Sequence, residues 1–408
     1  MKDALSRLSA PYLLKRAKCA IIKRAFPSGE TQTTSKEFTL QKYVRKIWDY
    51  LKVTPLGRKF ALGRRIRIMA RLSLAYKAIE DFGRANLPPD EKERLLADMV
   101  DCAKKYRFSY EEYFRFQLEH KSDLERRAFV SDTDRVVYID KLNKPKNQHL
   151  FDDKVATATA FAEFYQRDFC TCESAGDAER LARFLAKHKK AIVKPVSSAL
   201  GIGIKAVEAE NEQTAFQVAR ELVNEYCTSK YSGAIVEEFI VQDERMAALH
   251  PSSVNTVRVT TVRLDDRTVI FHPNLRIGRG DAVVDNAGAG GILAPVDPET
   301  GRVIVAGDKK GVFYKTHPDT GVRLEGFEVP CWREAVETVC KLAQVVPSNR
   351  YAGWDLALSK SGWVLVEANA RGQWGGQFLL QQGFRDEIEG YLKELGIKSP
   401  FAATLSRG

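Results

Sequence analysis

The sequence predicts an α+β protein that follows an all-helical N-terminal region. Two patterns lead to this prediction. Along residues 1–130, apolar side chains recur at spacings of three and four, as they do in successive amphipathic helices, and almost no strand pattern interrupts them. Further along the chain, short apolar strand patterns alternate with helical ones, and after Asn255 several strand patterns follow one another directly. A chain of 408 residues is too long for one core, so we expect three parts: 1–132, 133–245 and 246–408.

The N-terminal part carries the net charge of +11. Residues 1–150 hold 33 Lys and Arg against 19 Asp and Glu, and residues 1–77 alone hold 19 against 4. One interpretation is a solvated helical surface, and the other is attraction to anionic lipid head groups. No RNP, zinc-finger or helix-turn-helix pattern occurs, which argues against nucleic acid as a partner.

The cysteines and the N-terminus predict the compartment. Seven cysteines, an odd number without a C-x-x-C pair, suit a reducing environment. No run of 18 apolar residues occurs, and charges interrupt the apolar N-terminal run too often for a signal peptide. We therefore expect a cytoplasmic protein, with peripheral contact at the inner face of a membrane as the added hypothesis for its basic region.

The elements of the two α+β parts are predicted in order from these patterns. In the first part we expect a strand and turn over 135–147, helices over 153–168, 177–190 and 214–227, and strands over 191–196 and 233–241. In the second part we expect strands over 256–264, 268–278, 290–297 and 301–307, a helix over 332–345, and a hairpin that begins at Tyr351.

The first chemical motif is the strand and loop "AIVKPVSSALGIGIKAVE". Lys194 interrupts an otherwise apolar strand, and a buried ammonium needs an anion beside it. The loop that follows is small enough for its N–H groups to approach phosphate oxygens, although it lacks the ending of a Walker A loop. This predicts a phosphate site at Lys194, Ser197, Ser198, Gly201 and Gly203; the alternative is an ordinary turn.

The second motif is "GAIVEEFIVQDERM". Glu237 and Glu238 end a strand, and solvent-facing acids explain them adequately. Alternatively, the backbone of Glu238, Phe239 and Ile240 pairs with an adenine edge, while Asp243 or the following glutamate accepts hydrogen bonds from ribose.

The most specific motif is the hairpin "YAGWDLALSKSGWVLVEANARGQWGG". A three-residue turn over 360–362 pairs Ser359 with Trp363 and thereby places Asp355 opposite Glu367. Asn369 then shares the face of Glu367. Three oxygen ligands among apolar neighbours favour a hard cation such as Mg²⁺.

Arginines on neighbouring strands form the fourth motif. Arg258 and Arg276 precede a glycine-rich loop that Asn286 opens. Taken singly, each of these arginines is explained as an ordinary surface residue. Together with a phosphate loop and a metal hairpin, they form a cationic wall that stabilises charge on a transferring phosphoryl group.

The order of these motifs resembles the ATP-grasp superfamily from about Leu142 to about Gly383. The order is a strand lysine, a glycine hairpin, V-E-E-F-I, N-T-x-R, N-x-G-x-G-G and D…E-x-N. Within it, the chain is most similar to the sugar-transfer-associated group, whose members have a helical N-terminal region and occur with enzymes of polysaccharide biosynthesis. The motif of two arginines, an asparagine and a glycine pair, R…R…N-x-x-x-G-G, also resembles that of ligases that make amides of amino acids.

The resemblance implies an ATP-grasp fold, in which 133–245 is the lid with the phosphate hairpin and 246–408 carries the Mg²⁺ hairpin. It implies that Lys154 and Lys194 hold the α- and β-phosphates of ATP, that 237–240 line the adenine pocket, and that Asp243 contacts ribose. It also implies that Asp355, Glu367 and Asn369 bind two Mg²⁺ ions. The implied substrate contacts are Asn286, Gly290, Gly291 and Arg371. The residue before Asp355 is Trp354, which follows Gly353; several ligases of the family have an arginine at this position. The resemblance therefore implies that Arg258 or Arg276 stabilises the oxyanion.

The function that follows is ATP-dependent ligation of a carboxylate and an amine through an acyl phosphate. Lys194, Arg258 and Arg276 are the candidate catalytic residues, and no nucleophilic side chain is needed. The family association suggests a uronic acid or amino acid on a glycan precursor. A kinase on the same fold and a non-catalytic ATP-binding scaffold at the membrane are the alternatives, and a scaffold predicts a lost metal ligand.

Overall fold

The computed structural model describes residues 60–196, 202–285, 288 and 290–402, with side chains from residue 71 onward. Contacts divide the chain into residues 1–73 and 74–408. The described part of the first unit is the beginning of helix α3 (Phe60–Asp81). Among the described residues, no helix combines the length and apolar character of a membrane span.

The second unit begins with helices, as predicted for the described residues of the N-terminal region. They are α4 (Pro89–Lys105), α5 (Tyr110–Arg115) and α6 (Asp123–Ala128), with the 3-10 turn η2 (Leu118–His120) between the last two. Ser109 and Ser122 begin α5 and α6 with capping boxes, each reciprocated by the glutamate three residues on.

Helix α7 (Asp132–Leu142) corrects the strand predicted over 135–147. The side chain of Ser131 caps it by accepting the N–H of Asp134. Tyr138, Ile139 and Leu142 are buried on one helical face in a core that includes Phe384 and Ile388. This burial outweighs the weak strand preference of the Val-Val-Tyr-Ile run, since tertiary packing overrides local propensity.

Short helices lead into the first sheet. They are η3 (Pro145–Asn147), α8 (His149–Asp152), α9 (Lys154–Ala160) and α10 (Ala162–Tyr165). The single helix predicted over 153–168 is thus broken at Phe161. The buried ring of Phe161 packs edge-on against Trp354, at a centroid distance of 5.3 Å.

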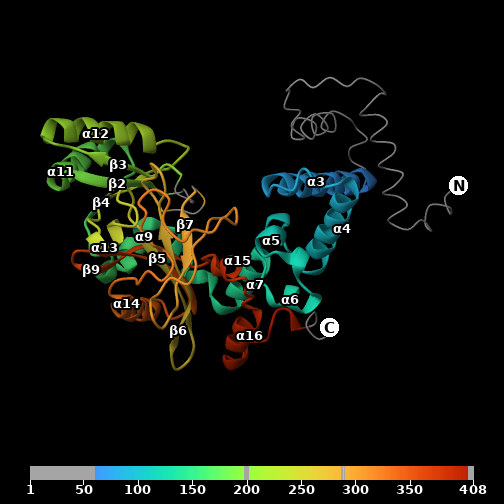
Figure 1. The fold of residues 1–408 in the computed structure, drawn as a ribbon. Coiled ribbons are helices and arrows are strands. Elements are labelled where there is room, and N and C mark those ends of the chain that lie inside the picture. Colours follow the sequence, from blue (N-terminus) through green and yellow to red (C-terminus); the bar gives the residue numbers. More distant parts are fainter. Residues whose placement is uncertain (1–59, 197–201, 286–287, 289, 403–408) are drawn as a thin grey trace, which may run out of the picture. The chain divides into compact units, whose positions relative to one another are not determined.

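The first sheet has four antiparallel strands in the order β1-β4-β2-β3. They are β1 (Phe169–Cys172), β2 (Lys190–Pro195), β3 (Lys205–Glu208) and β4 (Ala234–Glu238). Helices α11 (Ala178–His188), which follows the turn η4 (Ala175–Asp177), and α12 (Glu212–Tyr226) cover one face (Figure 1). Leu181, Leu185 and Leu222 share a core there with Val193 and Val236.

The second sheet has five antiparallel strands in the order β7-β6-β5-β8-β9. They are β5 (Thr256–Arg263), β6 (Thr268–Ile277), β7 (Ile292–Pro295), β8 (Tyr351–Ser359) and β9 (Gly362–Asn369). Helix α14 (Trp332–Val345) has the predicted bounds and shares a core with Val257, Val259 and Leu356 on one face. The segment 301–307, predicted as a strand, makes only isolated bridges.

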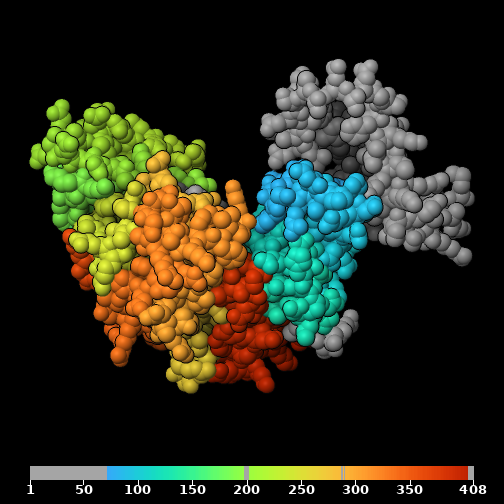
Figure 2. Space-filling model, viewed as in Figure 1, coloured from blue at the N-terminus to red at the C-terminus, as the bar shows by residue number. Residues whose placement is uncertain are grey.

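The remaining helices are α13 (Glu244–Ala247), α15 (Gly376–Leu380) and α16 (Arg385–Glu394). On the face seen in Figure 2, the C-terminal segment in red lies against the helices in teal. Arg385 joins them, because its guanidinium pairs with Asp134 and donates to the carbonyls of Arg127 and Phe129.

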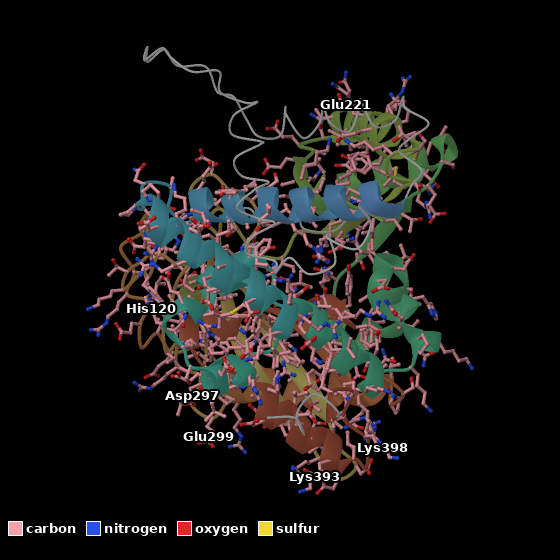
Figure 3. The ribbon with its side chains drawn as sticks, turned by 90° about the vertical axis from the view of Figure 1, so that its right-hand side faces the viewer. His120, Glu221, Asp297, Glu299, Lys393 and Lys398 are labelled. Atoms are coloured by element: carbon pink, nitrogen blue, oxygen red, sulfur yellow. The ribbon has the colours of Figure 1, made fainter. Side chains whose placement is uncertain are left out.

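Most charged side chains project into solvent, as Glu221, Glu299 and Lys393 do in Figure 3. The face of the second sheet opposite α14 is the main exception, because charged side chains on several strands point from it toward a cavity. This face carries the candidate site.

Candidate active site

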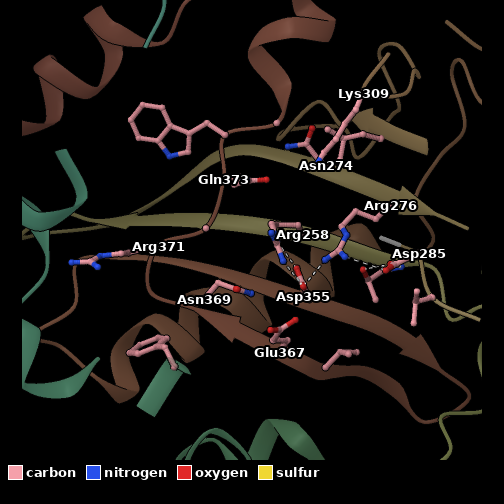
Figure 4. A pocket seen from close by; sticks show the side chains of 18 of the residues that line it. Arg258, Asn274, Arg276, Asp285, Lys309, Asp355, Glu367, Asn369, Arg371 and Gln373 are labelled. Carbon is pink, nitrogen blue, oxygen red and sulfur yellow. Dashed lines mark hydrogen bonds and ion pairs between the residues drawn. The ribbon is translucent and has the colours of Figure 1, made fainter. Parts of the chain in front are cut away.

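Strand register brings four polar side chains into one row across the second sheet. Glu367 lies opposite Asp355, Asp355 opposite Arg258, and Arg258 opposite Asn274. Directly opposed residues point to the same face of a sheet, so the row runs over β9, β8, β5 and β6 (Figure 4). Arg276 and Asn369 lie two residues along their strands from this row and share its face.

The predicted pairing of Asp355 with Glu367 is confirmed, but the route to it differs. The turn has two residues, because Ser359 pairs with Gly362 and Leu358 pairs with Trp363. A bulge at Val366 then adds one residue to β9 and restores the predicted register at Asp355. The prediction of a three-residue turn was therefore wrong.

A cavity of about 780 Å³ covers this face of the sheet. Most of the predicted site residues line it, from both sheets and from the segments between them. Lys194 and Glu367 thus face one cavity, as the nucleotide hypothesis requires. The predicted residues in the lining are Lys154, Lys194, Glu237, Glu238, Phe239, Ile240, Arg258, Arg276, Asp355, Glu367, Asn369 and Arg371.

Other predicted residues lie elsewhere. The carboxylate of Asp243 caps α13 and pairs with Arg245, outside the residues that line the cavity, so the structure does not place it for the predicted ribose contact. Gly203, Gly290 and Gly291 are not in the lining either; Gly203 has φ +76° and accepts a hydrogen bond from the Tyr226 hydroxyl. Ser197, Ser198, Gly201 and Asn286 lie outside the described residues.

Asp355 is the centre of a buried charge cluster. One carboxylate oxygen accepts from Arg258 Nε at 2.6 Å, and the other accepts from Arg258 Nη2 and Arg276 Nη1, each at 2.6 Å. Burial alone would raise the pKa of Asp355, but the two guanidinium groups outweigh burial and hold that pKa below its usual value. Asp285 also pairs with Arg276, at 3.2 Å, so both arginines are held in place before any ligand binds.

Glu367 and Asn369 leave oxygen and amide groups available for a cation. The Glu367 carboxylate faces the cavity with no hydrogen bond or ion pair to another described residue. The amide nitrogen of Asn369 is buried without a partner in the described structure, and a half-turn of an amide exchanges its nitrogen and oxygen. Asp355 keeps one free acceptor position beside its three bonds. This donor set fits Mg²⁺, which prefers a few carboxylate and amide oxygens.

Lys194 meets a carboxylate at the other end of the cavity. Its amine lies 2.8 Å from Glu237 Oε2, and both side chains are buried. The anion required by this buried lysine is thus already supplied by the protein. Burial would raise the pKa of Glu237, yet Lys194 and Arg167 lower it to about 2.

Lys154, the first residue of α9, lines the same cavity and interacts electrostatically with Glu367, Lys194 and Glu237. Burial lowers the pKa of its amine, the carboxylate of Glu367 opposes that change, and the charge of Lys194 adds to it. The two lysines and the acids around them therefore act on one another electrostatically within the same cavity.

A family model described as "Sugar-transfer associated ATP-grasp" matches residues 133–390, which is more than half of the chain. The chain belongs to this ATP-grasp family. The predicted α+β, ATP-grasp fold class is thereby confirmed, with both antiparallel sheets inside the matched residues. No protein among the curated ones compared matches the chain.

Several solved structures of synthetases and ligases resemble the chain at low identity. D-alanyl-alanine synthetase A from Vibrio cholerae is 12% identical, with a TM-score of 0.37 and 65% of each chain covered. N5-carboxyaminoimidazole synthetase from Staphylococcus aureus, complexed with ADP, is 13% identical, with a TM-score of 0.37 and coverage of 66% of this chain and 59% of that one. Phosphoribosylamine–glycine ligase from Thermotoga maritima is 13% identical, with a TM-score of 0.41 and coverage of 66% and 62%. The chain thus spans less than two thirds of the length of these structures.

Arg167 is a buried site residue that sequence reasoning missed. Its guanidinium contacts the Glu237 carboxylate at 2.8 and 3.0 Å and donates to the carbonyl of Leu365 at 2.5 Å. It therefore joins the partner of Lys194 on the first sheet to β9, beside the bulge that precedes Glu367. It lies near the end of the helix predicted over 153–168 and belongs to no recognisable motif, so the sequence offered no signal for this role.

The helical segment before the first sheet also lines this ATP-grasp cavity, which the sequence did not predict. Glu112, Arg115 and Arg135 contribute to one wall, and Lys309 contributes from the loop after β7. Arg115 donates from Nε to the carbonyl of Lys309 at 3.1 Å. A helical pattern predicts an element but not the distant surface that the element contacts, so these contributions required the structure.

Proposed function

We propose that this ATP-grasp protein binds ATP with Mg²⁺ and ligates a carboxylate to an amine through an acyl phosphate. The observation that carries the proposal is the order of charges across the cavity. Lys154 and Lys194 lie at one end, the oxygen donors Glu367 and Asn369 come next, and Arg258 and Arg276 follow. A polyphosphate that extends from the lysines toward the oxygen donors would end beside the two arginines.

Each group has a defined task in this proposal. Lys154 and Lys194 bind phosphate oxygens, and the strand end at 237–240 holds the adenine. Asp355, Glu367 and Asn369 would hold Mg²⁺, which neutralises phosphate charge and polarises the phosphoryl group. Arg258 and Arg276 orient the substrate carboxylate and stabilise the negative charge that develops on the oxygens around the transferred phosphorus.

The reaction then has two displacements. A carboxylate oxygen attacks the γ-phosphorus of ATP and ADP leaves, which forms the acyl phosphate. The amine attacks the acyl carbon, loses a proton and expels inorganic phosphate, which leaves the amide. No side-chain nucleophile is needed, so catalysis rests on positioning and charge neutralisation.

We propose that the acid is a uronic acid or an amino acid in glycan or glycoconjugate synthesis. The description of the matched family supports this choice of context. Peripheral contact of the basic N-terminal region with an anionic membrane is part of the same proposal, and residues 1–59 of that region lie outside the described residues.

Product analysis tests the reaction class. The full chain is incubated with ATP, Mg²⁺ and pools of uronic acids, amino acids and amines, and phosphate release and product mass are followed. A ligase releases phosphate in proportion to a new amide and only with both substrates present. A product that keeps the phosphate on a hydroxyl indicates a kinase, and nucleotide binding without any turnover indicates a scaffold; either result would replace the ligase proposal.

A further inference from the structure

We propose that Lys309 forms a second anion site in the cavity and that the side-chain oxygen of Asn274 accepts a hydrogen bond beside it. The lysine binds an anionic group of the acid substrate other than the carboxylate that reacts. This inference rests on the proposed ligase function. It narrows the substrate to acids that carry a second carboxylate or a phosphate, with a hydrogen-bond donor close to it.

The backbone around Lys309 is fixed by the protein itself. The buried carboxylate of Asp308 accepts the N–H groups of Lys310 and Val312, which closes the turn. Arg115 holds the carbonyl of Lys309 from helix α5. The lysine is thus presented to the cavity from a constrained loop rather than from a free surface segment.

The amine of Lys309 has an unsatisfied charge. It forms no hydrogen bond or ion pair with any residue that the structure describes, although its side chain is partly buried. Burial lowers its pKa first, and the charges of Arg115, Arg276 and Arg258 lower it further against the opposing effect of Glu111. A partly desolvated ammonium among other cations favours an anion as its partner.

Asn274 supplies an independent observation at the same end of the row. Its side chain is 5% exposed, and its amide nitrogen donates to the carbonyl of His272 at 2.7 Å. Its side-chain oxygen is buried without a partner in the described structure, and the residue lines the cavity. A buried acceptor without a donor is destabilising, so a hydroxyl or N–H group of a ligand would supply the missing hydrogen bond.

The position of this pair separates it from the nucleotide. Arg258 lies between Asn274 and Asp355 in the row, and Glu367 lies beyond Asp355 (Figure 4). A substrate whose reacting carboxylate meets Arg258 and Arg276 would therefore direct its other end toward Lys309. Phe116, Leu293 and Phe378 also line the cavity and offer apolar contact to the body of such a molecule.

Anion binding to the native protein tests the site without requiring turnover. The full chain is first saturated with ADP and Mg²⁺, and inorganic phosphate and glutarate are then titrated separately by calorimetry. Inorganic phosphate represents a phosphoryl group on the substrate, and glutarate represents a second carboxylate. The anion that binds more tightly therefore identifies which of the two groups the site recognises. We expect K309M to weaken the tighter anion about tenfold, as the loss of one charge-assisted contact would, and K309R to bind within about threefold of native.

Lys310→Met is the matched control, because Lys310 is exposed on the same loop and does not line the cavity. It should leave both affinities unchanged. Unchanged affinity in K309M, equal losses in K309M and K310M, or no binding of either anion to the native protein would overturn the proposed site. Failure of ADP to bind in the first step counts instead against the proposed function, which keeps the two failures distinguishable.

Discussion

Buried charge at single residues organises this cavity. Asp355 is shared by two arginines, and Glu237 is shared by Arg167 and Lys194. The Glu237 cluster has one carboxylate and two cations and so keeps a net positive charge, whereas Asp285 balances the second arginine of the Asp355 cluster. Such an arrangement is poorly matched to an apolar core and well matched to an anionic ligand.

The metal assignment is tested at Glu367, which forms no hydrogen bond or ion pair with a described residue. Glu367→Gln should leave the free energy of unfolding within about 0.5 kcal/mol of native. It should reduce turnover at least about a hundredfold and raise the Mg²⁺ concentration needed for half-maximal rate, because one anionic ligand is removed. Steady-state phosphate release across a Mg²⁺ series measures this.

The control for that substitution is Glu328→Gln, an exposed acid that pairs with Arg302 away from the cavity. It should change neither rate nor Mg²⁺ dependence. Native turnover in Glu367→Gln would show that the residue does not bind a required metal.

Lowering the pH should reduce the free energy of unfolding, because the carboxylate of Glu237 becomes protonated. Its pKa of about 2 lies below the ordinary value of 4.5, so its charged form stabilises the folded state at pH values above 4.5. This contribution, on the order of 3 kcal/mol, should be lost as the pH falls from about 4.5 to about 2. Urea unfolding between pH 7 and pH 3 measures the loss, which should be smaller in Glu237→Gln. Parallel losses in the two proteins would contradict the assignment.

At the scale of elements, the hairpin of β8 and β9 sets the spacing of the oxygen donors. Its two-residue turn alone would have put Asp355 opposite Val366. The bulge at Val366 moves Glu367 into that place and turns its carboxylate toward the cavity. The carbonyl of Leu365 just before the bulge accepts from Arg167, which ties this irregularity to the first sheet.

Arg167→Met tests that tie. Without the guanidinium, Lys194 is the one cation left beside the Glu237 carboxylate, and we expect a loss of about 3 to 5 kcal/mol in the free energy of unfolding. Nucleotide affinity should also fall, because the charge of Lys194 is then fully engaged by a buried carboxylate. Arg167→Lys should not restore either property, since an ammonium cannot reach a carboxylate and a carbonyl in one fork. Denaturant unfolding and calorimetric ADP titration measure the two effects.

Arg180→Met is the comparison, because Arg180 forms a half-exposed pair with Asp177 in the same subdomain. Pairs of this kind contribute about 0 to 1 kcal/mol. If Arg167→Met is no more destabilising than Arg180→Met, the proposed connection between the sheets is wrong.

At the scale of the whole molecule, the cavity is assembled from segments far apart in the chain. Its lining begins at Ser109 and ends at Phe378, with contributions from the helical segment and both sheets. The helical segment is therefore part of the candidate site. Residues 1–59 lie outside the described structure and hold 14 Lys and Arg against 4 Asp and Glu.

Deletion of residues 1–59, which leaves α3 whole, separates the two hypotheses for the basic region. Turnover should persist, because every lining residue remains. Sedimentation with vesicles of phosphatidylglycerol and phosphatidylcholine at low salt should fall relative to the full chain, because about 1 kcal/mol is lost for each basic residue near the surface. Equal sedimentation of both proteins would favour the interpretation of a solvated surface.

Local pattern by itself determined the α+β class, the bounds of the helix over 332–345, and the identities of Lys194, Arg258, Asp355, Glu367 and Asn369 as candidates. These follow from side-chain periodicity and from charges placed within apolar strands, which are properties of short segments. Tertiary structure decided the rest: α7 is helical because its apolar face is buried, Glu237 is the partner of Lys194 and Arg167, and Asn274 and Lys309 line the cavity. Each of these depends on contacts between segments distant in sequence, whose energies no local pattern records.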